Sequence, residues 1–302
     1  MLPRPDDPTY DPAFVAALIE VALPELAHAE VVSLDRGWDC DVFRLGHTHV
    51  VRVARNSFAS GGISLDARLL PLVRAQLTLP VPAPVYLGTL PGDTSVCFGV
   101  YHFLPGAPLC EVELTPDAYA RLAPALGQFM RSLHAVALSA DIELPDDQIG
   151  RLDPARRSAA TRACLARLLW EGALSGTECA RLEAALDLAE ESPLSASRVL
   201  VHGDLHGCNM LVGEGGFTGI IDWVDAHRGH PATDLATPFL TLPPSTHAAL
   251  FEAYGALDAG TLAWARWRAI TWLTTALQGS RARDDRAMAH GCVVRLQATA
   301  LP

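Results

Sequence analysis

The chain has 302 residues, of which 50% are hydrophobic, and its formal net charge at pH 7 is −11. A chain of this length can bury a large core, and it has no run of about eighteen uncharged apolar residues of the kind that spans a membrane. The negative charge disfavours nucleic acid as a partner and is compatible with a cationic small substrate. We expect a cytoplasmic protein, since the first residues lack a signal-peptide pattern. We also expect a monomer or weak dimer with no membrane partner.

The seven cysteines are scattered along the chain. None forms the close pairs that zinc sites use, and their number is odd. This usage is typical of a reducing compartment. We therefore expect free thiols, with no disulfide framework and no metal cluster.

The first third of the chain is rich in predicted strands. Alternating apolar and β-branched residues predict strands over Val31–Leu34, Val42–Leu45, His49–Val53, Pro84–Leu87 and Val96–Phe103. After Gly61-Gly62, the segment Asp66–Val73 is helical in composition but is interrupted by Pro71. These elements predict an antiparallel sheet with one short helix.

The pattern changes to helical beyond Pro105-Gly106. Thr115-Pro116 predicts a capped helix start, Pro124 is expected to kink or split that helix, and Pro154–Trp170 forms a second helical tract. Ser175-Gly-Thr-Glu178 reads as a capping box that opens a third. The sequence thus predicts an α+β architecture of two lobes, residues 1–104 and 105–302.

The strongest chemical signal is the segment His202-Gly-Asp-Leu-His-Gly-Cys-Asn209, followed by a predicted hairpin and then Asp222. Asp204 is a carboxylate that can accept a hydroxyl proton, and Asn209, five residues later, has an amide oxygen that can bind magnesium. The predicted hairpin, Met210–Gly213 and Phe217–Ile221, adds Asp222 as a second oxygen ligand. Phosphoryl transfer needs such parts, because the protein must position an alcohol and neutralise phosphate oxygens.

This motif, together with Ile221-Asp-Trp223, resembles the signature of the aminoglycoside and macrolide phosphotransferases, which are similar in fold to protein kinases. The resemblance implies a kinase-like small antiparallel-sheet lobe and a larger helical lobe, with Asp204 as catalytic base. It implies Mg²⁺ on Asn209 and Asp222, and a nucleoside triphosphate as donor. His202 and Asp234 resemble residues that support the catalytic loop, whereas the roles of His206 and Asp225 stay open.

The resemblance also implies which residues of the first lobe meet the nucleotide. Arg52 stands where kinases have a lysine, Asp66 stands for its acidic partner, and Gly37 lies in the loop expected to cover the phosphates. Tyr101 falls at the back of the base pocket, and the hinge that meets the base comprises His102, Phe103 and Leu104. A bulky tyrosine there accompanies GTP preference in the aminoglycoside enzymes that phosphorylate the 2″ hydroxyl, so GTP is favoured over ATP.

Three classes of function remain open at this stage. The first is an antibiotic kinase that phosphorylates a hydroxyl of an aminoglycoside, a macrolide or a related compound. The second is a metabolic kinase for choline, homoserine, a fructosamine or a sugar, and the third is a catalytically silent nucleotide-binding protein. Trp264, Trp267 and Trp272 are expected to pack in the core, with a substrate pocket as the alternative.

Overall fold

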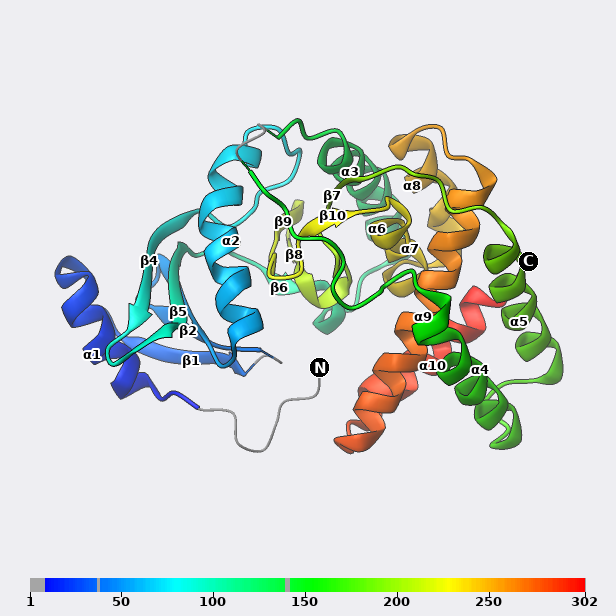
Figure 1. Ribbon diagram of the computed structural model, residues 1–302, viewed down its shortest axis with the longest axis horizontal. Helices are drawn as coiled ribbons and strands as arrows, with labels where there is room; N and C mark the ends of the chain where they lie inside the picture. Colours follow the sequence, from blue (N-terminus) through cyan, green and yellow to red (C-terminus); the bar gives the residue numbers. More distant parts are fainter. Residues whose placement is uncertain (1–8, 37–38, 139–141, 302) are drawn as a thin grey trace. The chain divides into compact units, whose positions relative to one another are not determined.

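The computed structural model describes residues 9–36, 39–138 and 142–301. Its residues divide into two compact units: the first lies within 1–107, 138–142 and 211–225, and the second within 108–137, 143–210 and 226–302. Figure 1 shows the blue and cyan sheet of the first unit and the green, orange and red helices of the second. The domain boundary at residue 104 stays a prediction.

A five-stranded antiparallel sheet, in the order β1-β2-β3-β5-β4, forms the centre of the first unit. Its strands are β1 (Val31–Arg36), β2 (Cys40–Leu45), β3 (His49–Ala54), β4 (Pro84–Leu90) and β5 (Asp93–His102). All five predicted strands are present, and the predicted α+β class is confirmed by this sheet together with the many helices.

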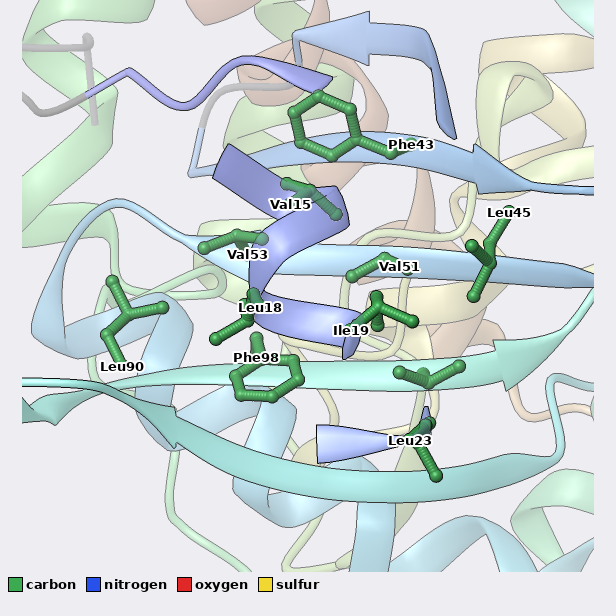
Figure 2. Close-up of a cluster of buried hydrophobic side chains, with 11 residues drawn as sticks. Val15, Leu18, Ile19, Leu23, Phe43, Leu45, Val51, Val53, Leu90 and Phe98 are labelled. Atoms are coloured by element: carbon green, nitrogen blue, oxygen red, sulfur yellow. The ribbon is translucent and has the colours of Figure 1, made fainter. Parts of the chain in front are cut away.

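The two faces of this sheet have different chemistry, because side chains along a strand alternate between faces. In β3, Val51 and Val53 are fully buried in a cluster that includes Val15 and Ile19 of α1 (Pro12–Ala22). Figure 2 shows these side chains between α1 and the strands. Arg52 therefore points to the opposite face, where it meets the helix α2 (Ser57–Val73).

The helix α2 is longer than the sequence predicted. It begins at Ser57 behind the cap Asn56, whose side chain accepts a hydrogen bond from the Ala59 amide. The prediction that Gly61-Gly62 precedes the helix is wrong, because both glycines lie within α2. A Cβ on Gly62 would overlap Val224, so glycine there lets the helix pack closely against Val224. Pro71 lies in the last turn and does not interrupt the helix.

The predicted hairpin after the motif is confirmed. It consists of β8 (Met210–Gly213) and β9 (Gly216–Ile220), and these strands form a three-stranded sheet in the order β6-β8-β9 with β6 (Ala107–Pro108). The amide of Ile220 donates to the Pro80 carbonyl, 2.9 Å away, so the end of the hairpin is held against the proline-rich segment of the first unit.

The second unit is mainly helical. Its helices are α3 (Pro116–His134), α4 (Pro154–Trp170), α5 (Gly176–Glu191), α6 (Ala232–Leu235), α7 (Thr237–Thr241), α8 (His247–Tyr254), α9 (Ala259–Ala282) and α10 (Arg286–Thr299). It also holds an antiparallel pair, β7 (Val199–Val201) with β10 (His227–Gly229). The predicted cap at Thr115 and the capping box at Ser175 are confirmed, and α3 continues through Pro124 without a split. Within the described part of the chain, no helix combines the length and apolar character needed to cross a membrane.

Candidate active site

The motif forms a loop that begins at the end of β7 and is anchored by Asp234. The Asp234 carboxylate is fully buried and accepts hydrogen bonds from the backbone amides of His202 (2.8 Å) and Gly203 (2.9 Å). Burial raises the pKa of Asp234, but bonding to His134 and the charges of His134 and His202 outweigh it, so the pKa lies below its ordinary value. Asp234 thus stays ionised and fixes the start of the loop.

Asp204 lies in this loop with two side-chain donors on its carboxylate. Trp272 Nε1 donates to Oδ1 at 3.1 Å, and His206 Nε2 lies 3.3 Å from Oδ2. Burial opposes ionisation, but the charge and hydrogen bond of His206 and the bond from Trp272 bring the pKa of Asp204 below its ordinary value. The side chain keeps 32% of its surface exposed. An ionised carboxylate with free lone pairs is therefore held where an alcohol can reach it.

The orientation of His206 follows from its two ring nitrogens. Nδ1 accepts a hydrogen bond from the Cys208 amide at 3.3 Å, so the proton of the neutral ring lies on Nε2, which faces Asp204. His206 also caps the 3-10 helix η3 (Gly207–Asn209), and its ring lies 4.9 Å from that of Trp272. His206 therefore connects the cap of η3 to the Asp204 carboxylate.

Asn209 is buried at the end of η3. Its Nδ2 donates to the Asp204 carbonyl at 2.8 Å, which turns Oδ1 away from the loop backbone. His202 is fully buried, and its Nδ1 accepts a hydrogen bond from the Asp204 backbone amide at 3.3 Å. The structure thus brings together the five motif residues His202, Asp204, His206, Asn209 and Asp234, all within the second unit.

In the first unit, Arg52 bonds two of the other predicted residues, and a third bonds one of these. Its Nη1 lies 3.2 Å from Asp66 Oδ2, its Nη2 bonds the Asp222 carboxylate, and Tyr101 Oη donates to Asp66 at 3.4 Å. Asp66 and Tyr101 are buried. Asp222 has a φ of 63°, a left-handed conformation that aspartate tolerates and that is more frequent at functional sites than elsewhere.

The predicted hinge runs from the end of β5. The amide of His102 donates to the Ala83 carbonyl (2.9 Å) and that of Phe103 to the Thr48 carbonyl (2.8 Å), whereas the Leu104 amide has no acceptor among the described residues. The Leu104 side chain packs against Gly219 of β9, where a Cβ would lie 2.7 Å from Leu104 Cδ1. Leu104 is thus the hinge residue with a free backbone donor.

Gly37 lies outside the described residues. Asp225 is half-buried, three residues beyond Asp222.

The donor set fits a magnesium ion. Magnesium prefers carboxylate and amide oxygens and keeps further positions for phosphate and water. Asn209 offers an oriented amide oxygen, and the Asp222 side chain is 43% exposed. No cluster of three or more His, Cys, Asp or Glu side chains suited to a metal occurs in the described part of the chain. That Asn209 and Asp222 hold Mg²⁺ stays a prediction.

The structure corrects the prediction for the cysteines. Cys110 and Cys208 form a disulfide with a Cα–Cα distance of 5.0 Å, and the other five cysteines are free. The bond joins the 3-10 helix η2 (Leu109–Glu111) to η3, immediately before Asn209. The two residues lie 98 positions apart, so sequence spacing gave no sign that η2 and η3 pack together.

This disulfide predicts a definite thiol count. We expect five reactive thiols per chain when the oxidised protein is denatured without reductant, and seven after reduction, because the chain has seven cysteines. A disulfide closing a loop of about 100 residues restricts the unfolded chain by up to about 4.7 kcal/mol, so reduction should also lower the melting temperature. The Cys110→Ser/Cys208→Ser double variant should not respond to reductant. Seven thiols without reductant would contradict the pairing.

Two residues near Asp204 lie far from the motif in sequence, and the sequence offered Trp272 only as an alternative pocket residue and gave no sign of Arg268. Trp264 and Trp267 are buried, as expected for core residues, but Trp272 is half-buried and bonds Asp204. Arg268 lies one helical turn before Trp272 on α9 and shares its face. No motif surrounds Arg268, and only the fold places it near Asp204.

Comparison with known proteins places this site in a family. A family model described as "Phosphotransferase enzyme family" matches residues 30–270. No curated protein matches the sequence. Among solved structures, the GDP and kanamycin complex of APH(2″)-IIIa matches with a TM-score of 0.71 and 20% identity, covering 94% of this chain and 97% of that chain.

Two further structures are similar. The GDP complex of aminoglycoside 2′-phosphotransferase-IIIa gives a TM-score of 0.72 at 18% identity, covering 96% of this chain and 99% of that chain. Macrolide 2′-phosphotransferase MphH from Brachybacterium faecium, an apoenzyme, gives 0.57 at 25% identity, covering 93% and 97%.

Together, the sheet of the first unit, the helices of the second and these likenesses show a protein-kinase-like fold. The chain belongs to the phosphotransferase enzyme family, whose model covers most of its length. It is a phosphotransferase with an alcohol group as acceptor.

Proposed function

We propose that the protein phosphorylates a hydroxyl of an antibiotic of the aminoglycoside or macrolide type, with a nucleoside triphosphate as donor and Asp204 as base. The observation that carries this proposal is the fixed carboxylate of Asp204, with Trp272 on one oxygen and His206 on the other. The relatives named above support the substrate class, because one was solved with kanamycin and another is a macrolide 2′-phosphotransferase.

In the proposed reaction, the substrate hydroxyl oxygen attacks the γ-phosphorus, the bond from that phosphorus to the β,γ-bridging oxygen breaks, and the nucleoside diphosphate leaves. Asp204 orients the hydroxyl and accepts its proton. The lowered pKa of Asp204 makes it a weak base, so it first orients the hydroxyl. The proton moves to Asp204 late in the reaction, when bond formation to phosphorus has made the hydroxyl acidic. His206 and Trp272 keep the carboxylate in place.

Asn209 and Asp222 would hold Mg²⁺, which when bound neutralises charge on the phosphate oxygens. Arg52 binds phosphate oxygens with a planar guanidinium, and Asp66 keeps that group in place. The free amide of Leu104 meets the base. Tyr101 behind the hinge supports GTP as the preferred donor, and GDP complexes of two relatives are compatible with this choice.

The proposal is tested by nucleoside diphosphate release with ATP and GTP in parallel, over kanamycin-type aminoglycosides, macrolides, choline, homoserine and sugars. We expect stimulation by one antibiotic class and a higher kcat/KM for GTP. Stimulation by a metabolite alone would replace the antibiotic with a metabolic acceptor. A higher kcat/KM for ATP would contradict the role given to Tyr101. Nucleotide binding without turnover for every acceptor would overturn the proposed activity.

A further inference from the structure

Arg268 is a buried arginine beside the catalytic-loop carboxylate. Its exposure is 6%, and it lies four residues before Trp272 on α9, so both side chains are on one face of the helix. Trp272 contacts Asp204 directly, and the charges of Arg268 and Asp204 influence each other. The guanidinium of Arg268 thus lies close to the carboxylate that receives the acceptor hydroxyl.

The guanidinium of Arg268 has no hydrogen-bond or ion-pair partner among the described residues. Asp204 does not serve as one, because no hydrogen bond or ion pair joins its carboxylate to Arg268. A guanidinium carries five N–H donors, and on a residue that is only 6% exposed these donors have little access to water. A folded protein tolerates such a group most readily where a ligand supplies the acceptors.

Its other charged neighbours increase the need for an anion. Burial lowers the pKa of Arg268 to about 9, and the charges of Arg151 and Arg157 add to this, whereas the carboxylates of Asp204 and Asp147 oppose it. Arg151 bonds the Asp147 carboxylate and the Gly203 carbonyl, and Arg157 bonds the backbone carbonyls of Gly150 and Ile149. Three guanidinium groups thus gather near one side of the loop, and Arg268 alone among them has no acceptor within the described chain.

We propose that Arg268 is an oxyanion-binding residue, which hydrogen-bonds a phosphate or carboxylate group of a substrate held next to Asp204. Two sources have this chemistry: the phosphoryl group in transfer, and an acidic group on the acceptor. In either case, a polycationic acceptor would have to keep its ammonium groups away from this end of the site. The inference rests on the proposed phosphotransfer at Asp204 for its catalytic meaning, but anion binding by Arg268 is measurable without turnover.

The first experiment uses inorganic phosphate as probe, measured by isothermal titration calorimetry on the intact protein. We compare wild type with Arg268→Gln and with Arg266→Gln, a control on the same helix whose guanidinium bonds the carbonyls of Thr299 and Leu301. We expect at least tenfold weaker phosphate binding in Arg268→Gln alone, with partial recovery in Arg268→Lys. Equal binding in Arg268→Gln, or no binding by wild type, would overturn the proposal.

A second experiment distinguishes the two sources. If Arg268 binds the transferred phosphoryl group, Arg268→Gln should lower kcat about 100-fold for every acceptor, and for hydrolysis of the nucleotide by water. If it binds an acid on the acceptor, the KM for that acceptor should rise at least tenfold while hydrolysis by water stays unchanged. Phosphate binding that depends on Arg268 in a protein without turnover would refute the proposed function and leave the anion site intact.

Discussion

Replacing Asp204 with asparagine should lower kcat by about 10³-fold while leaving nucleotide affinity within about twofold of wild type. Asparagine has the shape of aspartate, so its amide oxygen can still accept the hydrogen bond from Trp272. The asparagine side chain cannot take up the hydroxyl proton. Its amide group would also face the protonated Nε2 of His206. Turnover is measured by diphosphate release at saturating acceptor, and affinity by titration with the nucleotide.

A matched control is Asp187→Asn, which removes an exposed carboxylate in the same unit that pairs with Arg162. This control should keep full activity. Trp272→Phe should lie between the two, because it leaves Asp204 ionised but removes one of the groups that orient it. A kcat for Asp204→Asn within about threefold of wild type would refute the assignment of Asp204 as base.

The local parts of this site were predictable from sequence because they are contiguous. Asp204 and Asn209 lie on one loop, and the glycine turn at 213–216 predicted the hairpin that leads to Asp222. Hydrogen bonds within five residues, such as that from Asn209 to the Asp204 carbonyl, are determined by such short segments. The strands of the first sheet were predicted for the same reason, since alternation is a local signal.

The contacts that complete the site come from distant segments, and no local signal announces them. Trp272 reaches Asp204 across 68 positions, and Cys110 reaches Cys208 across 98. In the sequence, Trp272 is one of three tryptophans in a helical stretch, and burial is the ordinary explanation for each. Arg268 looks like any charged residue on a helix until the fold buries it.

The first unit shows how far a predicted partner can differ from the expected ion pair. Asp66 was expected to hold Arg52 as an ordinary carboxylate, and the contact is present at 3.2 Å. However, Asp66 is 1% exposed and its Oδ1 has no hydrogen-bond partner. Burial raises the pKa of Asp66 to about 7, even though Arg52 and the Tyr101 hydroxyl oppose that rise. Near neutral pH, Asp66 is therefore partly protonated, whereas the ion pair between Arg52 and the Asp222 carboxylate remains.

We expect this proton to make the stability of the protein depend on pH. Between pH 4 and 7, native Asp66 binds a proton that the unfolded chain, with a pKa of 3.8, has released, so the free energy of unfolding falls as pH rises. From pH 5 to pH 8 the loss from this residue is roughly 2–3 kcal/mol. Asp66→Asn removes the titration and should therefore remove that part of the loss. Urea unfolding at pH 5 and pH 8 measures the difference.

His230, whose burial lowers its pKa to about 4, stabilises the fold more as the pH rises through the same range, so the effect of Asp66 is measured as the difference between wild type and Asp66→Asn. Other carboxylates act in a separate pH range. Asp204 and Asp234 have lowered pKa values, so they stabilise the fold above about pH 4 and lose that effect as the pH falls further. Asp187→Asn should leave the difference between pH 5 and pH 8 as in wild type. If Asp66→Asn changes as much as wild type between the two pH values, then Asp66 is ionised throughout, and Arg52 is held by two carboxylates at neutral pH.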